Sequence, residues 1–147
     1  MKNARAAYRE SNVHGASAIR LVVLLYDQII QDLAQAEDAF SRGDIEKRTQ
    51  LLNHAILVIA HLQSPLDFSK GGKVAGDLDH FYTVLRQNLV RVQFSPSIAG
   101  IRQQITDVQA LREAWIEVER AEKSATPPSP PSRALSDSDA GRVDWKG

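Results

Sequence analysis

The chain has 147 residues, which fits one domain with a tail, and eighteen Lys and Arg balance eighteen Asp and Glu. This balance argues against nucleic-acid binding and against attachment to an anionic membrane. The absence of cysteine excludes disulfides, thiolate nucleophiles and Cys-ligated metal centres. The longest apolar run, residues 21–26, is too short for membrane insertion, which takes about 20 residues. Because the polar N-terminus also lacks the apolar core of a secretory signal, we expect a cytoplasmic protein.

Composition divides the chain into three parts. Residues 1–16 form a polar arm, residues 17–123 show helical periodicity, and residues 124–147 are rich in Pro and Ser. Such a tail buries too little apolar surface to offset its ordering entropy, so it is predicted to be disordered. For Trp145, near the end of the tail, the preferred interpretation is a residue without a partner rather than a docking motif.

Within residues 17–123, apolar residues recur at steps of three and four, which predicts helices and no strands. The expected boundaries are Ser17 as first N-cap, Gly43 as first stop, Asp44 as second N-cap, Ser64-Pro65 as second stop, a turn at residues 69–72, a third helix from Val74, and a break and cap at Ser95-Pro96-Ser97. Short connections make successive helices antiparallel neighbours. The predicted fold is all-α, an antiparallel up-down-up-down four-helix bundle with an N-terminal arm and a disordered C-terminal tail.

Several apolar residues fall outside the core stripes when residues are placed at about 100° intervals. They are Leu21, Val23 and Leu24 in the first helix, Leu57 in the second, and Val84, Val90 and Phe94 in the third. Exposed apolar residues on neighbouring faces, beside an arm that carries a tyrosine, indicate a surface for a partner.

Signals for catalysis, a metal or a cofactor are poor. The histidines at 14, 54, 61 and 80 lack the paired Glu-x-x-His motifs of a di-iron bundle and are interpreted as solvated surface residues. Gly71-Gly72 lacks the Lys-Ser/Thr of a phosphate loop. One alternative function stays open, a histidine phosphotransfer-type signalling bundle. Ala60-His61-Leu62 resembles the start of that motif, although Ser64-Pro65 replaces the Lys-Gly that normally follows.

Short motifs follow one another in a specific order along the chain. They are Ala7-Tyr8, Val13, Ala16-Ser17, Leu24-Leu25-Tyr26-Asp27, Gly43-Asp44, Leu66-Asp67-Phe68, Gly71-Gly72, Val74-Ala75-Gly76-Asp77-Leu78, Tyr82 and Leu111-Arg112-Glu113-Ala114-Trp115. In order and spacing, from Tyr8 to about Ala121, the chain resembles the flagellar secretion chaperone family FliS. Gly15, Ala18, Gln28 and Asp77 depart from the residues that are frequent in the family at these positions.

The resemblance implies a cytoplasmic chaperone without enzymatic activity or cofactor. Such a chaperone binds the disordered C-terminal segment of flagellin, prevents premature polymerisation and delivers the subunit to the flagellar type III secretion apparatus, where an export-gate component is a further partner. The residues expected in the flagellin groove and its lid are Tyr8, Val13, Leu21, Leu24, Leu25, Tyr26, Leu57, His61, Tyr82 and Val84.

The arm is expected to act as a lid on the groove. With no client bound, Tyr8 and Val13 would lie over an apolar surface beside residues 21–26 and would limit self-association to a weak homodimer. The alternative, that Tyr8 completes the core permanently, stays open at this point.

Overall fold

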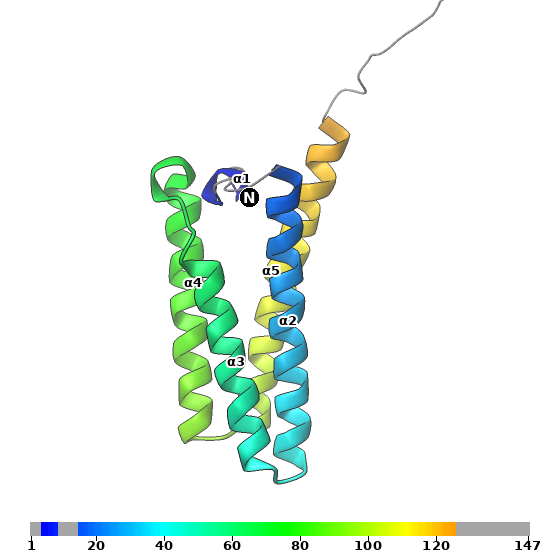
Figure 1. Ribbon diagram of the computed structural model, residues 1–147, viewed down its shortest axis with the longest axis vertical. Helices are drawn as coiled ribbons and strands as arrows, with labels where there is room; N and C mark the ends of the chain where they lie inside the picture. Colours follow the sequence, from blue (N-terminus) through cyan, green and yellow to red (C-terminus); the bar gives the residue numbers. More distant parts are fainter. Residues whose placement is uncertain (1–3, 9–14, 126–147) are drawn as a thin grey trace, which may run out of the picture.

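The computed structural model describes residues 4–8 and 15–125. Its elements are α1 (Ala4–Ala7), α2 (Gly15–Ser41), α3 (Ile45–Gln63), α4 (Phe68–Phe94) and α5 (Ile98–Ala125). The four long helices run up and down in turn, and α1 lies at the end of the bundle where α2 begins and α5 ends (Figure 1). No strand occurs in these two ranges, so the predicted all-α up-down-up-down bundle is confirmed.

The turn between α2 and α3 follows the prediction in detail. Gly43 has a φ of +72°, and its N–H donates to the Phe40 carbonyl while the Asp44 N–H donates to the Ala39 carbonyl. This pair of bonds is a Schellman motif, which favours glycine because of the positive φ. Asp44 then caps α3, since its side chain accepts a hydrogen bond from the Lys47 N–H at 3.1 Å.

The turn predicted at residues 69–72 is wrong in its position. The Asp67 side chain accepts from the Lys70 N–H at 3.0 Å and from the Ser69 hydroxyl, so a helical turn already begins at Phe68. The break occurs at Gly72, whose φ of +52° and ψ of −127° interrupt α4. Residues 68–71 therefore form a separate turn of helix, which leads into the long part of α4.

Of two predicted N-caps, one is confirmed and the other is wrong. Ser97 caps α5 as predicted, because its Oγ accepts from the Gly100 N–H at 3.0 Å. Ser17 is not an N-cap, since α2 begins two residues earlier, at Gly15. Helix α5 continues to Ala125, and the predicted tail beyond it, with Trp145, lies outside the described residues. No helix within the described ranges is long and apolar enough to cross a membrane.

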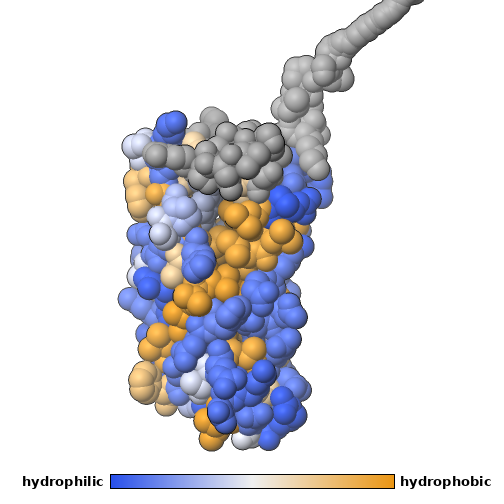
Figure 2. Space-filling model, in the orientation of Figure 1, coloured by the Kyte–Doolittle hydropathy of each residue, from blue (hydrophilic) through white to orange (hydrophobic). Residues whose placement is uncertain are grey.

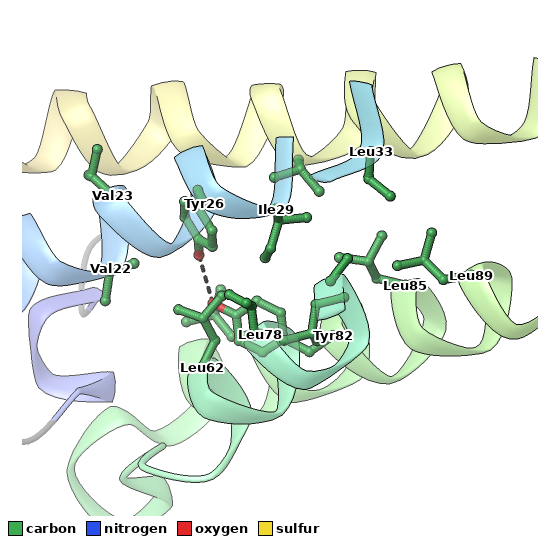
Figure 3. Packing of buried hydrophobic residues seen from close by; sticks show 14 of the residues in the cluster. Val22, Val23, Tyr26, Ile29, Leu33, Leu62, Leu78, Tyr82, Leu85 and Leu89 are labelled. Carbon is green, nitrogen blue, oxygen red and sulfur yellow. Dashed lines mark hydrogen bonds between the residues drawn. The ribbon is translucent and has the colours of Figure 1, made fainter. Parts of the chain in front are cut away.

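The core is built from the predicted stripes, and Figure 3 shows side chains of α2 and α4 meeting between the helices. One residue was placed wrongly by the helical wheel. Val23 is buried rather than outward-facing, and in Figure 3 it points toward α5. Helix α2 packs against α3 on one flank and α5 on the other, so its buried arc is wider than one stripe.

Candidate partner-binding surface

The arm is held against the junction between α3 and α4 largely by main-chain contacts. The Asp67 N–H donates to the Ala7 carbonyl at 2.8 Å, and Tyr8 forms an isolated antiparallel bridge with Leu66. Ala7 is fully buried against Gly71, where an added Cβ would lie 2.6 Å from the Ala7 Cα. A side chain at residue 71 would therefore push the arm off this surface.

Tyr8 carries the arm into the core. Its ring packs on Trp115 with centroids 5.6 Å apart, and its hydroxyl donates to the Leu62 carbonyl at 2.7 Å. The hydroxyls of Tyr8 and Tyr82 lie 2.7 Å apart, and those of Tyr82 and Tyr26 lie 2.6 Å apart. Three helices and the arm thus meet at a chain of three phenols, of which the Tyr26–Tyr82 bond is drawn in Figure 3.

The direction of the hydrogen bonds in this chain follows from proton counting. Burial raises the pKa of Tyr8, Tyr26 and Tyr82 above the ordinary value of 10.0, so each phenol keeps its single proton at neutral pH. Since Tyr8 donates to the Leu62 carbonyl, Tyr82 must donate to Tyr8, and Tyr26 must donate to Tyr82.

The acceptor at the end of the chain explains why α3 needs Tyr8. The Leu62 carbonyl is one of the last four of α3, which have no partner within an ideal helix. The Leu66 N–H, its regular partner, bonds to the Gln63 carbonyl instead. Tyr8 therefore caps the C-terminus of α3 from a distant part of the sequence.

The structure separates the predicted groove residues into two groups. Tyr8, Tyr26 and Tyr82 are buried when the arm is docked, and their contact with a client stays a prediction. Their hydroxyls pair with one another, which lets polar groups fill the core. Val13 lies outside the described residues.

The second group forms an exposed apolar surface. Leu21, Leu24 and Leu57 are 52%, 53% and 55% exposed, and Leu25 is half-buried beside them on α2. We call Leu21, Leu24 and Leu57 the leucine patch. Figure 2 shows apolar side chains on the face formed by α2 and α3, in the half nearer the arm. Leu21, Leu24 and Leu57 stay exposed although Tyr8 is docked in the core, and the lid stays a prediction.

The register of α2 and α3 follows from one hydrogen bond between their side chains. His54 Nδ1 lies 2.5 Å from Asp32 Oδ2, so residues seven positions away on each helix, Leu25 and His61, are at the same level of the antiparallel pair. His61 is exposed there, as predicted. His54 is not simply solvated, because it pairs with the buried Asp32, which also accepts from Gln28 at 2.9 Å.

Polar side chains pair across two other seams of the bundle. Three ion pairs cross the α2–α5 seam. Arg20 of α2 pairs with Glu119 of α5, and Arg102 and Arg112 of α5 pair with Glu37 and Asp27 of α2. Gln63 bonds to Asp79 and Thr83 across the α3–α4 seam. The half of the α2–α3 seam near the arm instead exposes leucines, so it is the surface best suited to an apolar partner. Val84, which sequence reasoning grouped with the patch, lies on α4, outside this seam.

One further feature was not predicted, although Val90, one of its residues, was placed outside the core stripes. A cavity of ≈ 340 Å³ opens between α3 and α4, lined by Ile56, Thr83, Arg86, Gln87 and Val90. No group of three or more His, Asp or Glu within the described ranges is arranged to hold a metal ion.

Comparison with known proteins identifies the family. The family model described as "Flagellar protein FliS" matches residues 1–122. The chain belongs to the FliS family. It is 31% identical over 119 residues to the flagellar secretion chaperone FliS of Campylobacter jejuni, covering 81% of this chain and 93% of that protein. It is 35% identical over 95 residues to FliSB of Pseudomonas aeruginosa, covering 65% and 75%, and 27% identical over 110 residues to FliS of Salmonella typhimurium, covering 74% and 82%.

FliS proteins are chaperones and not enzymes, so this chain is a flagellar export chaperone. The predicted family and function class are confirmed. Family membership also favours the chaperone over the histidine phosphotransfer alternative, which depended on His61 and a motif that stops at Leu62.

Proposed function

We propose that this FliS-family chain binds the C-terminal segment of flagellin in the cytoplasm, keeps the subunit from polymerising and delivers it to the flagellar type III export apparatus. The observation that carries the proposal is the leucine patch, an exposed apolar surface on the α2–α3 seam, whereas polar side chains pair across the α2–α5 and α3–α4 seams. An amphipathic segment that is disordered when free gains affinity by folding onto such a surface.

The arm gives the proposal a second element. Tyr8 fills a site bordered by Leu62, Tyr82 and Trp115, next to the half-buried Leu25 region of α2. A client that extends from the leucine patch toward this end of the bundle meets the arm and has to displace it. The arm is then a lid on part of the binding site, and its docking free energy is subtracted from that of the client.

The experiment is calorimetric titration of the full chain with the flagellin C-terminal segment, comparing Leu24→Asp with the control Ile45→Asp. Both residues are exposed aliphatics, 53% and 64%, but Ile45 lies at the start of α3, at the other end of the bundle. Loss of one half-buried leucine contact and desolvation of a carboxylate should weaken binding by about tenfold or more in Leu24→Asp.

The control variant should bind as the parent chain does. Equal weakening by both substitutions would place the client elsewhere, and absence of any binding by the parent chain would contradict the proposal itself. Pull-down of co-expressed flagellin and secretion in cells then test delivery to the export apparatus, for which the same two variants provide the comparison.

A further inference from the structure

The end of α5 lies close to the leucine patch. Arg20 of α2 pairs with Glu119 of α5 at 3.3 Å, which puts these two residues at the same level of the bundle. Ala125, six positions further on, is about 9 Å beyond that level, and Leu24 is about 6 Å on the other side of it at 1.5 Å per residue. With helices about 10 Å apart, Ala125 and Leu24 are separated by roughly 18 Å.

The chain that follows Ala125 is long enough to span this distance. About twenty residues separate Ala125 from Trp145. A chain of that length with an extended Pro-rich start and a random coil after it has a root-mean-square span of about 25–30 Å. When the span of a tether is comparable to the distance between two sites, the effective concentration of the tethered group is near its highest, on the order of millimolar. Ile45 and the other exposed apolar residues at the far end of the bundle are about 40 Å away, well beyond this span.

The tail also carries a suitable side chain. Its only large apolar residues are Leu135, Val143 and Trp145, and Trp145 is one of just two tryptophans in the chain. An indole gains by leaving water for a surface of half-exposed leucines, and its N–H can stay solvated at the edge. Charge does not oppose the contact, since the tail has as many basic as acidic residues, namely Arg133, Arg142 and Lys146 against Asp137, Asp139 and Asp144.

We propose that the C-terminal segment Val143–Trp145 docks in the same molecule onto the leucine patch, with the Trp145 indole on Leu21 and Leu24. A bimolecular dissociation constant near 1 mM suffices for about half occupancy, because the tether supplies a similar effective concentration. The contact itself does not depend on the proposed function. Its consequence does: flagellin and the tail would compete for one surface, so the tail would lower the apparent affinity for the client.

The test follows the indole N–H resonances of the full chain by NMR. Two indoles give two signals, and the one that disappears in Trp145→Ser belongs to Trp145. We expect this signal to lie away from its position in a free peptide of residues 126–147 and to move to that position in Leu24→Asp. The control Ile45→Asp should leave it unchanged.

Three results would overturn the contact. They are a Trp145 signal that coincides with the free peptide in the parent chain, an equal shift caused by Leu24→Asp and Ile45→Asp, and a shift that grows with protein concentration, which would mean docking between copies. Circular dichroism melting confirms that each variant folds.

The consequence for the client is measured separately. Trp145→Ser should raise the apparent affinity for the flagellin segment by about twofold if the tail occupies the patch half of the time. A Trp145 signal that differs from the free peptide, without any flagellin binding, would support the contact and contradict the proposed function. Flagellin binding with a Trp145 signal identical to that of the free peptide would support the proposed function and contradict the contact.

Discussion

Tyr8→Phe tests whether the arm is a lid or a fixed part of the core. The substitution removes one oxygen and keeps the ring that packs on Trp115. It deletes two buried hydrogen bonds, from Tyr8 to the Leu62 carbonyl and from Tyr82 to Tyr8, each 2.7 Å long. Only one of Tyr82 and Tyr26 can donate to the other, so the Leu62 carbonyl and one phenol O–H are left without a partner. We estimate a cost of about 2 kcal/mol for the docked arm.

The two hypotheses predict different effects of this loss of free energy. If the arm is a lid, about 2 kcal/mol shifts the ratio of open to docked arm by roughly 30-fold, and the apparent affinity for the flagellin segment rises by up to that factor. If Tyr8 is permanent core, the client never competes with it, and the cost is seen only as a melting temperature lower by about 5 °C.

Calorimetric titration of both chains with the flagellin segment, together with amide hydrogen exchange at the Asp67 N–H, separates the hypotheses. The Asp67 N–H reports on the arm because it donates to the Ala7 carbonyl. Faster exchange at this amide with tighter client binding supports the lid. Unchanged or weaker binding, with protection at Asp67 lost only in global unfolding, would refute it.

Three further outcomes are expected. Gly71→Ala should release the arm and tighten client binding, as seen by titration, while Gly76→Ala, with open space around the added Cβ, should not. His54→Ala should lower the free energy of unfolding by about 1–3 kcal/mol in urea because buried Asp32 keeps only Gln28 as a partner, whereas exposed His61→Ala should stay within about 0.5 kcal/mol. Because burial raises the pKa of three tyrosines above 10.0, the stability that they contribute is complete below that pH. Above pH 10 the unfolded chain releases protons that the folded chain keeps, so stability should fall by up to about 4 kcal/mol per pH unit, measured by phenolate absorbance during alkaline unfolding.

The periodicity of apolar residues and the capping residues were sufficient to predict the four-helix architecture. The stop at Gly43 and the caps at Asp44 and Ser97 depend on residues within five positions of one another, so a local reading of the sequence finds them. Val23 was misplaced for a physical reason, because a wheel centred on one stripe assumes one neighbouring helix and α2 has two.

The candidate site was less accessible to such reasoning. Tyr8 is 54 positions from its acceptor at Leu62 and 74 from Tyr82, and a phenol on an apolar stripe looks the same whether it faces a groove or another phenol. The Asp32–His54 pair is likewise set by the register of two helices. The exposed leucines were found because exposure, unlike pairing, follows from the angle around a single helix.

The way in which the arm is attached bears on how a client could remove it. Its described contacts with the bundle lie at one end, on the α3–α4 junction and on Tyr82 and Trp115, and the arm supplies no turn of the long helices. Opening therefore breaks a few hydrogen bonds and uncovers two buried side chains, Ala7 and Tyr8, without separating any pair of long helices. Local opening of this kind costs less than global unfolding and is reversible. A client that folds onto the leucine patch could supply that free energy while the bundle stays intact, so the bundle acts as the stable scaffold and the arm as the part that yields.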